Sequence, residues 1–165
     1  MAIDVEETIK VGIADLNVCI PPKTITTIGL GSCVGVAIRD TVLKIGGLVH
    51  VMLPDSTAVV SNENLAKFAD TGIVELVRLL EQEGCRRNRL EAKIAGGAQM
   101  FAFQNKSDLL GVGARNVEAC KKKLQELSIP LKAEDTGLNY GRTVTYHPDT
   151  GAYEIKAVGR EMKVI

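Results

Sequence analysis

The chain has 165 residues, 45% of them hydrophobic, which is enough for a single domain over residues 1–165 whose core needs no disulfides. Its 20 Lys and Arg balance its 20 Asp and Glu, with no block of five like charges, so the basic footprint of a nucleic-acid-binding protein is missing. The N-terminus is acidic where a signal peptide would be apolar, and no apolar run approaches the ~18 residues of a membrane span. We therefore expect a cytoplasmic protein that binds no nucleic acid and does not insert into a membrane.

The first predicted elements are strands. A β-branched run, Thr24–Ile28, is followed by two further strands at 34–39 and 45–53. A short connection at 40–44 separates the last two. This arrangement predicts a β-hairpin.

Two segments have helical periodicity. Apolar residues recur at steps of three and four between Ser61 and Gly84, which predicts a helix with Ser61 or Asn62 as its N-cap and Gly84 as its stop. A second helix is indicated over 117–127, ending before Pro130.

The remaining strands follow the helices. A short strand at 90–95 ends at a pair of glycines, and two strands at 142–146 and 152–158 flank the turn sequence at 148–151, which predicts a second hairpin. The element order predicts an α/β layered sandwich with a mixed, largely antiparallel sheet and two main helices, although an α+β arrangement fits the same pattern.

The sequence Gly-Leu-Gly-Ser-Cys-Val-Gly at 29–35 allows two interpretations. Its glycine spacing resembles a dinucleotide-binding fingerprint. Asp55 lies near the position expected for the acidic residue that binds the ribose. That fingerprint requires the glycines to open a helix, whose N-terminus holds the phosphates. The residues at 34–39 favour a strand instead, so a nucleotide site is the weaker interpretation.

The hairpin gives the other interpretation, a platform for Cys33. If the turn is centred between Thr41 and Val42, Cys33 lies directly opposite His50, with Cβ atoms about 4.5–5.5 Å apart. A nearby imidazolium would stabilise the thiolate and take its pKa from about 8.5 to as low as about 3.5. The histidine would then protonate the leaving group.

Two features complete this hypothetical site. Backbone N–H groups at Gly31, Ser32 and Cys33 have little side-chain bulk around them and would hold an oxyanion. The second nitrogen of the imidazole needs a partner that fixes its tautomer, and the residues alone leave Thr26 and Thr27 as equal candidates.

The alternative for Cys33 and His50 is that both are ordinary core residues. We expect the other cysteines, Cys19, Cys85 and Cys120, to belong to the core, and His147 to face solvent. The cysteines form no CxxC pair, which argues against a metal site or a disulfide framework.

Five motifs run in order along most of the chain and together resemble the CheD family, the chemoreceptor glutamine deamidases of chemotaxis. The motifs are Thr27–Cys33, His50–Pro54, Ala95–Ala98, Gly113–Asn116 and Ala133–Gly137. The combination of GLGSC with HVMLP, seventeen residues from cysteine to histidine (50 − 33 = 17), is the specific part of the resemblance.

The resemblance implies an α/β sandwich related to cysteine-dependent deamidating toxins of the cytotoxic necrotizing factor type. It implies a triad of Cys33 as nucleophile, His50 as base and acid, and Thr27 as the residue that orients the imidazole. The implied reaction converts glutamine side chains on cytoplasmic chemoreceptor helices to glutamate through a thioester, with neither metal nor organic cofactor.

A second function is also implied, that of a signalling module that binds the CheC phosphatase and has weak or no activity. Met100 and Phe101 are the candidate partner-binding residues, since exposed apolar side chains in a loop anchor partners. The competing expectation is that this loop folds back on the core as a lid.

Overall fold

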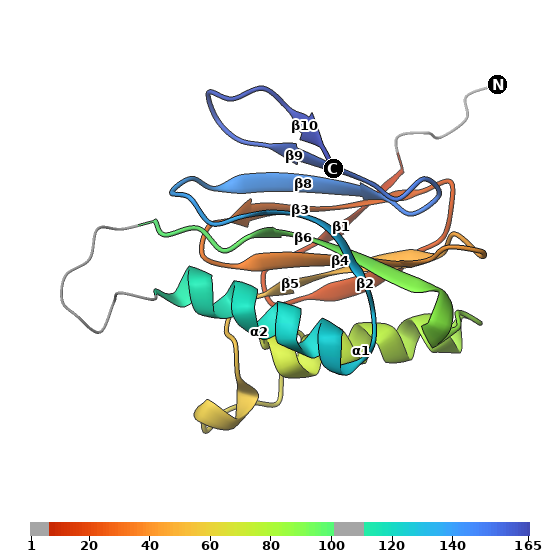
Figure 1. Cartoon of the computed structure of the whole chain (residues 1–165), viewed down its shortest axis with the longest axis horizontal. Helices are drawn as coiled ribbons and strands as arrows, with labels where there is room; N and C mark the ends of the chain where they lie inside the picture. The colour runs from red at the N-terminus through yellow and green to blue at the C-terminus, as the bar shows by residue number, and fades with distance from the viewer. Residues whose placement is uncertain (1–6, 101–110) are drawn as a thin grey trace.

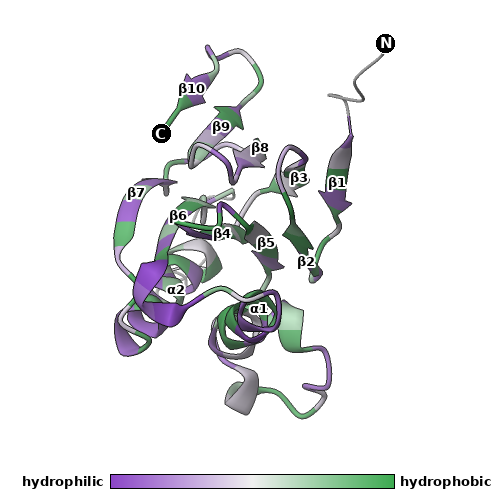
Figure 2. Ribbon diagram, turned by 90° about the vertical axis from the view of Figure 1, so that its right-hand side faces the viewer, coloured by the Kyte–Doolittle hydropathy of each residue, from purple (hydrophilic) through white to green (hydrophobic). Residues whose placement is uncertain are grey.

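The strands form two five-stranded sheets that pack face to face, with two helices beneath one of them (Figures 1 and 2). The structure is a computed structural model and describes residues 7–100 and 111–165. The sheet that carries no helices, which we call the outer sheet, has the order β1 (Thr8–Val11), β3 (Thr24–Leu30), β8 (Arg142–His147), β9 (Ala152–Lys156) and β10 (Lys163–Val164).

The other sheet, which we call the central sheet, lies between the outer sheet and the helices. Its order is β2 (Leu16–Cys19), β5 (Gly46–Val51), β4 (Val34–Asp40), β6 (Leu90–Gly96) and β7 (Leu131–Thr136). The β1–β3 and β6–β7 pairs are parallel, and the other neighbouring strands are antiparallel. The helices are α1 (Ala69–Gln82) and α2 (Val112–Glu126), with short 3₁₀ turns at Ser56–Ala58, Leu65–Lys67 and Arg87–Arg89. The predicted layered α/β sandwich is confirmed.

The alternation of side chains along β4 divides the core into two parts. Val34, Val36 and Ile38 face the helices, whereas Ala37 belongs to the apolar cluster between the two sheets. Gly35 lies on the same face as Ala37, and a Cβ there would come within 2.7 Å of the Tyr153 hydroxyl, which donates to the Gly35 carbonyl at 2.9 Å. Small residues on this face therefore let the outer sheet approach the central sheet.

Both predicted hairpins are present, but the first helix begins later than expected. Asn64 caps a 3₁₀ turn by accepting a hydrogen bond from the amide of Ala66. Phe68 is then extended and bridges to Leu53, so α1 starts only at Ala69 and not at Ser61. Of the periodic residues before Ala69, Phe68 is buried without belonging to a helix, whereas Leu65 is 43% exposed.

Four strands have no counterpart among the predicted elements: β1, β2, β7 and β10. Each is only two to six residues long, and their partly buried or exposed residues alternate too weakly to mark a strand from sequence. The second helix starts earlier than predicted, since α2 begins at Val112. Among the described residues, no helix has the length and apolar character needed to span a membrane.

Candidate active site

The loop between β3 and β4 carries Cys33 and is held from one side through its carbonyl groups. The Gly31 carbonyl accepts from the Ala98 amide at 2.8 Å, and the Cys33 carbonyl accepts from the Gly97 amide at 2.8 Å. The Ser32 carbonyl accepts from Asn116 Nδ2 at 2.9 Å. All three carbonyls in succession therefore point into the protein.

This arrangement of the loop requires the two glycines at the end of β6, Gly96 and Gly97. Gly96 has φ of 111°, and a Cβ there would lie 2.2 Å from the Cys33 carbonyl oxygen. No residue with a side chain would fit against the loop in that position. The β3–β4 loop begins a strand and not a helix, which confirms that the glycines do not open a dinucleotide fold.

The predicted register of the hairpin is wrong by two residues. Gly35, not Cys33, lies directly opposite His50. The turn is longer than expected because the Asp40 amide donates to the Ile45 carbonyl, while the Asp40 carboxylate accepts from the amides of Val42 and Leu43.

A shift of two residues preserves the face of the sheet. Cys33 accordingly packs against the apolar cluster between the two sheets. The His50 side chain lies on the same face of the central sheet, where it contacts Thr27 of the outer sheet. Residues placed diagonally across a strand pair are about 7–8 Å apart, within reach of side chains. Gly35 lies between them along β4, and the space over it is occupied by the Tyr153 hydroxyl and the Leu30 side chain.

His50 is fully buried and has its tautomer fixed by Thr27. The Thr27 hydroxyl donates to the Val11 carbonyl at 2.7 Å, so it accepts from Nδ1–H of His50, also at 2.7 Å. The other ring nitrogen, Nε2, is therefore unprotonated, and it has no hydrogen-bond partner among the described residues. Thr26 points elsewhere and donates to the Val144 carbonyl at 2.6 Å, so Thr27 is the partner of the imidazole.

Burial shifts the pKa values of both groups toward their neutral forms. It lowers the pKa of His50 to about 4 and raises the pKa of the Cys33 thiol above its ordinary value. The expected thiolate–imidazolium pair is therefore wrong for the resting site, which holds a neutral thiol and a neutral imidazole.

The lowered pKa of His50 predicts a loss of stability in acid. Between the pKa of an exposed histidine, ~6.5, and about 4, the unfolded chain binds a proton that the folded chain does not, so stability falls as pH falls through this range. Between pH ~7 and ~5 we expect the wild type to lose about 2 kcal/mol more unfolding free energy than the His50→Gln variant. Urea unfolding at the two pH values measures this difference, and equal losses in the two proteins would contradict the assignment.

The oxyanion candidates differ in how free their amides are. The Gly31 amide donates to the Gly29 carbonyl at 3.1 Å and so already has an acceptor. The amides of Ser32 and Cys33 donate to no acceptor among the described residues. Met100 lies over this loop, since a Cβ on Gly31 would be 3.2 Å from its Cγ, and it is 43% exposed. Phe101 lies outside the described residues.

The other candidates have structural surroundings. Cys19, Cys85 and Cys120 are buried, as expected, and all four cysteines are free thiols. His147 was expected to face solvent but is half-buried and lies 3.2 Å from a Glu154 oxygen. Within residues 7–100 and 111–165, no group of three or more Cys, His, Asp or Glu side chains is placed to hold a metal ion.

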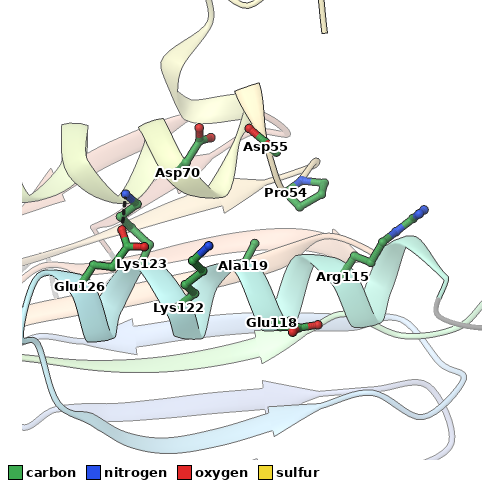
Figure 3. Close-up of a pocket in the computed structure, with 9 residues that line it drawn as sticks. All are labelled: Pro54, Asp55, Asp70, Arg115, Glu118, Ala119, Lys122, Lys123 and Glu126. Atoms are coloured by element: carbon green, nitrogen blue, oxygen red, sulfur yellow. Dashed lines mark hydrogen bonds and ion pairs between the residues drawn. The ribbon is translucent and has the colours of Figure 1, made fainter. Parts of the chain in front are cut away.

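A groove of about 400 Å³ lies between the two helices and is lined by charged side chains from both sides (Figure 3). In this view Lys122 points into the groove below Asp70, and Lys123 pairs with Glu126. None of the candidate site residues lines this groove. Acyl-transfer chemistry by Cys33 and His50 would therefore take place at the end of the sheets and not in the groove between the helices.

Asn116 is the residue of this region to which the sequence assigned no role. It lies on the buried face of α2 with Gly113, Cys120 and Leu124, where a polar side chain is unexpected. Such a residue needs buried partners, and its Nδ2 finds them in the carbonyls of Ser32 and Met52, while its Oδ1 has no hydrogen-bond partner among the described residues. A polar residue within the apolar stripe of the helix was the signal that would have identified it.

The fold and the candidate site together describe a class of protein. It is a layered α/β protein in which two sheets bring a threonine, a histidine and a cysteine to the same end of the molecule. The chain matches the family described as "CheD chemotactic sensory transduction" over residues 52–157. This protein belongs to the CheD family.

Relatives of similar length support this assignment. The "Probable chemoreceptor glutamine deamidase CheD" of Lachnoclostridium phytofermentans is 61% identical over 159 residues, which cover 96% of this chain and 99% of the relative. The "Chemoreceptor glutamine deamidase CheD" of Halalkalibacterium halodurans is 52% identical over 160 residues, 96% of this chain and 99% of the relative. A protein of Clostridium novyi named like the first is 48% identical over 160 residues, 97% of this chain and 99% of the relative.

Proposed function

We propose that this protein hydrolyses glutamine side chains to glutamate on the cytoplasmic helices of chemoreceptors. The names of its relatives support the substrate and the reaction. The observation that carries the chemistry is the buried chain from the Val11 carbonyl through Thr27 to His50, because it leaves Nε2 of His50 as an unprotonated base. The imidazole and the Cys33 thiol lie on the same face of the central sheet.

The reaction begins from the neutral pair. As Cys33 Sγ forms a bond to the carboxamide carbon, Nε2 of His50 takes the thiol proton. The carbonyl oxygen becomes an oxyanion, which the amides of Ser32 and Cys33 stabilise by hydrogen bonds. Thr27 keeps the ring in the tautomer that this proton transfer requires.

The tetrahedral intermediate then breaks its C–N bond. His50 returns the proton to the leaving nitrogen, ammonia departs, and a thioester to Cys33 remains. Water attacks the thioester carbon while His50 accepts its proton. As the C–S bond breaks, His50 returns this proton to Cys33 Sγ and restores the thiol, and the new carboxylic acid loses its proton to solvent to give glutamate. One imidazole serves as base and acid in both halves of the reaction, so the mechanism uses no metal or organic cofactor.

The alternative proposal, binding of the CheC phosphatase, places the partner on Met100. A partner seated there would contact the side chain that lies on Gly31 and would cover the loop of Cys33. Binding of this kind would compete with the receptor substrate.

Incubation of the protein with a purified chemoreceptor cytoplasmic fragment tests the proposed function. Conversion of an amide to a carboxylate adds about one dalton for each modified glutamine, which peptide mass spectrometry resolves. We expect the gain at particular glutamines and in proportion to enzyme and time. A fragment whose mass is unchanged, from a protein that still binds the CheC phosphatase, would favour the alternative.

A further inference from the structure

The carboxamide of Asn116 joins the two halves of the candidate site. Asn116 is fully buried in α2, and its Nδ2 donates to the Ser32 carbonyl and to the Met52 carbonyl, both at 2.9 Å. Ser32 immediately precedes Cys33, and Met52 lies two residues after His50. One side-chain amide therefore fixes the loop of the thiol against the end of the strand that carries the imidazole.

The bond to Ser32 also fixes the direction of an amide proton. The Ser32 carbonyl and the Cys33 N–H belong to the same peptide unit, which is planar and trans. In such a unit the C=O and N–H bonds point in opposite directions. Because Asn116 holds the carbonyl inward, the Cys33 N–H points away from α2, and it has no acceptor among the described residues.

The neighbouring peptide unit is held in the same way by a different donor. The Ala98 amide holds the Gly31 carbonyl, and the Ser32 N–H consequently points outward too. Ala98 acts through its main chain, which no substitution other than proline removes. Asn116 acts through its side chain, and a hydrogen bond to a peptide carbonyl also polarises that peptide and strengthens its N–H as a donor.

We propose that Asn116 is a positioning residue that aims the Cys33 N–H at the oxyanion formed when Cys33 attacks a carbonyl carbon. The identity of the natural substrate rests on the proposed function. The geometry itself applies to any acyl compound that the thiol attacks. Asn116 touches neither substrate nor thiol in this role and acts only through the Ser32–Cys33 peptide.

Two reactions of the same thiol separate this role from a general effect on the loop. With p-nitrophenyl acetate, the C–S bond forms while the carbonyl oxygen becomes an oxyanion, and p-nitrophenolate then leaves. With iodoacetamide, the C–S bond forms at a methylene carbon as iodide leaves, and no oxyanion appears. In the Asn116→Ala variant we expect acetylation of Cys33 to slow by about 10- to 100-fold, because an oxyanion donor is misdirected. Alkylation is expected to stay within about twofold of the wild type, because it uses no such donor.

Peptide mapping of Cys33 measures both rates, with the Cys33→Ala protein as background. Leu124→Ala is the matched control, because Leu124 is buried on the same face of α2 and belongs to the helix-side core, away from the loop. It should leave the ratio of acetylation to alkylation unchanged at a comparable loss of thermal stability. The Asn116→Leu variant, which has a similar volume and donates no hydrogen bond, is used for the comparison if the alanine variant does not fold.

Two outcomes would overturn the inference: an unchanged ratio in the folded Asn116 variants, or an equal fall of both rates, which would indicate a merely structural role. Failure of the proposed function has a different signature. In that case the wild type would be acetylated at Cys33 in an Asn116-dependent way but would leave the receptor glutamines intact. This result would contradict glutamine as the substrate and would still support the positioning role of Asn116.

Discussion

Replacing Cys33 with alanine is expected to abolish deamidation of the chemoreceptor fragment, with kcat lower by about 10⁴-fold or more. Without Sγ there is no atom to form the thioester, and an unassisted water molecule must attack a carboxamide. The gain of about one dalton per glutamine should disappear from the peptide mass spectrum. Since the Cys33 side chain is only partly buried, its truncation leaves the core nearly intact and the variant should fold.

Cys120→Ala is the control for this variant. Cys120 is a free thiol buried between α2 and the central sheet, and burial raises its pKa to about 12, so it should not react. Its loss should leave the rate of deamidation within about twofold of the wild type, because the change is confined to packing away from the site. Deamidation that persists in Cys33→Ala would exclude Cys33 as the nucleophile.

Replacing His50 with glutamine is expected to lower kcat by about 10³-fold at neutral pH, because the side chain that we propose as the base for the thiol proton is lost. The pH dependence should change as well. In the wild type the imidazole is neutral above pH about 4, so the rate should fall only as pH falls through that value.

In the His50→Gln variant, attack depends on thiolate formed without assistance. Because the pKa of Cys33 is raised, the rate should climb steadily through alkaline pH with no plateau near neutrality. Thr27→Val separates positioning from base chemistry, since it keeps the imidazole and removes only the hydroxyl at 2.7 Å. An identical pH profile in wild type and His50→Gln would show that another group acts as the base.

The sequence predicts the elements whose signals are local. Both hairpins, the short strand that ends at Gly96 and the two helices are present, although α1 begins later and α2 earlier than the apolar periodicity indicated. The short strands β1, β2 and β7 depend on pairing with distant partners, so nothing within their own four to six residues identifies them.

Prediction of the site fails where long-range contacts decide the geometry. The register of the first hairpin was wrong because the buried Asp40 carboxylate binds two amides of the turn and lengthens it. The expected pKa directions were wrong because burial favours the neutral forms of both the Cys33 thiol and the His50 imidazole. The Thr27–His50 hydrogen bond, which the residues alone left open, is present as the resemblance implied, while the catalytic roles of Thr27, His50 and Cys33 stay predictions.

The hydrogen bond between Thr27 and His50 crosses from the outer sheet to the central sheet, so the site is assembled from two layers. A partly melted form in which the layers slide apart would keep most of its secondary structure and yet lose the oriented imidazole. Heat inactivation of this protein should therefore track the separation of the layers, ahead of any loss of helix or strand signal.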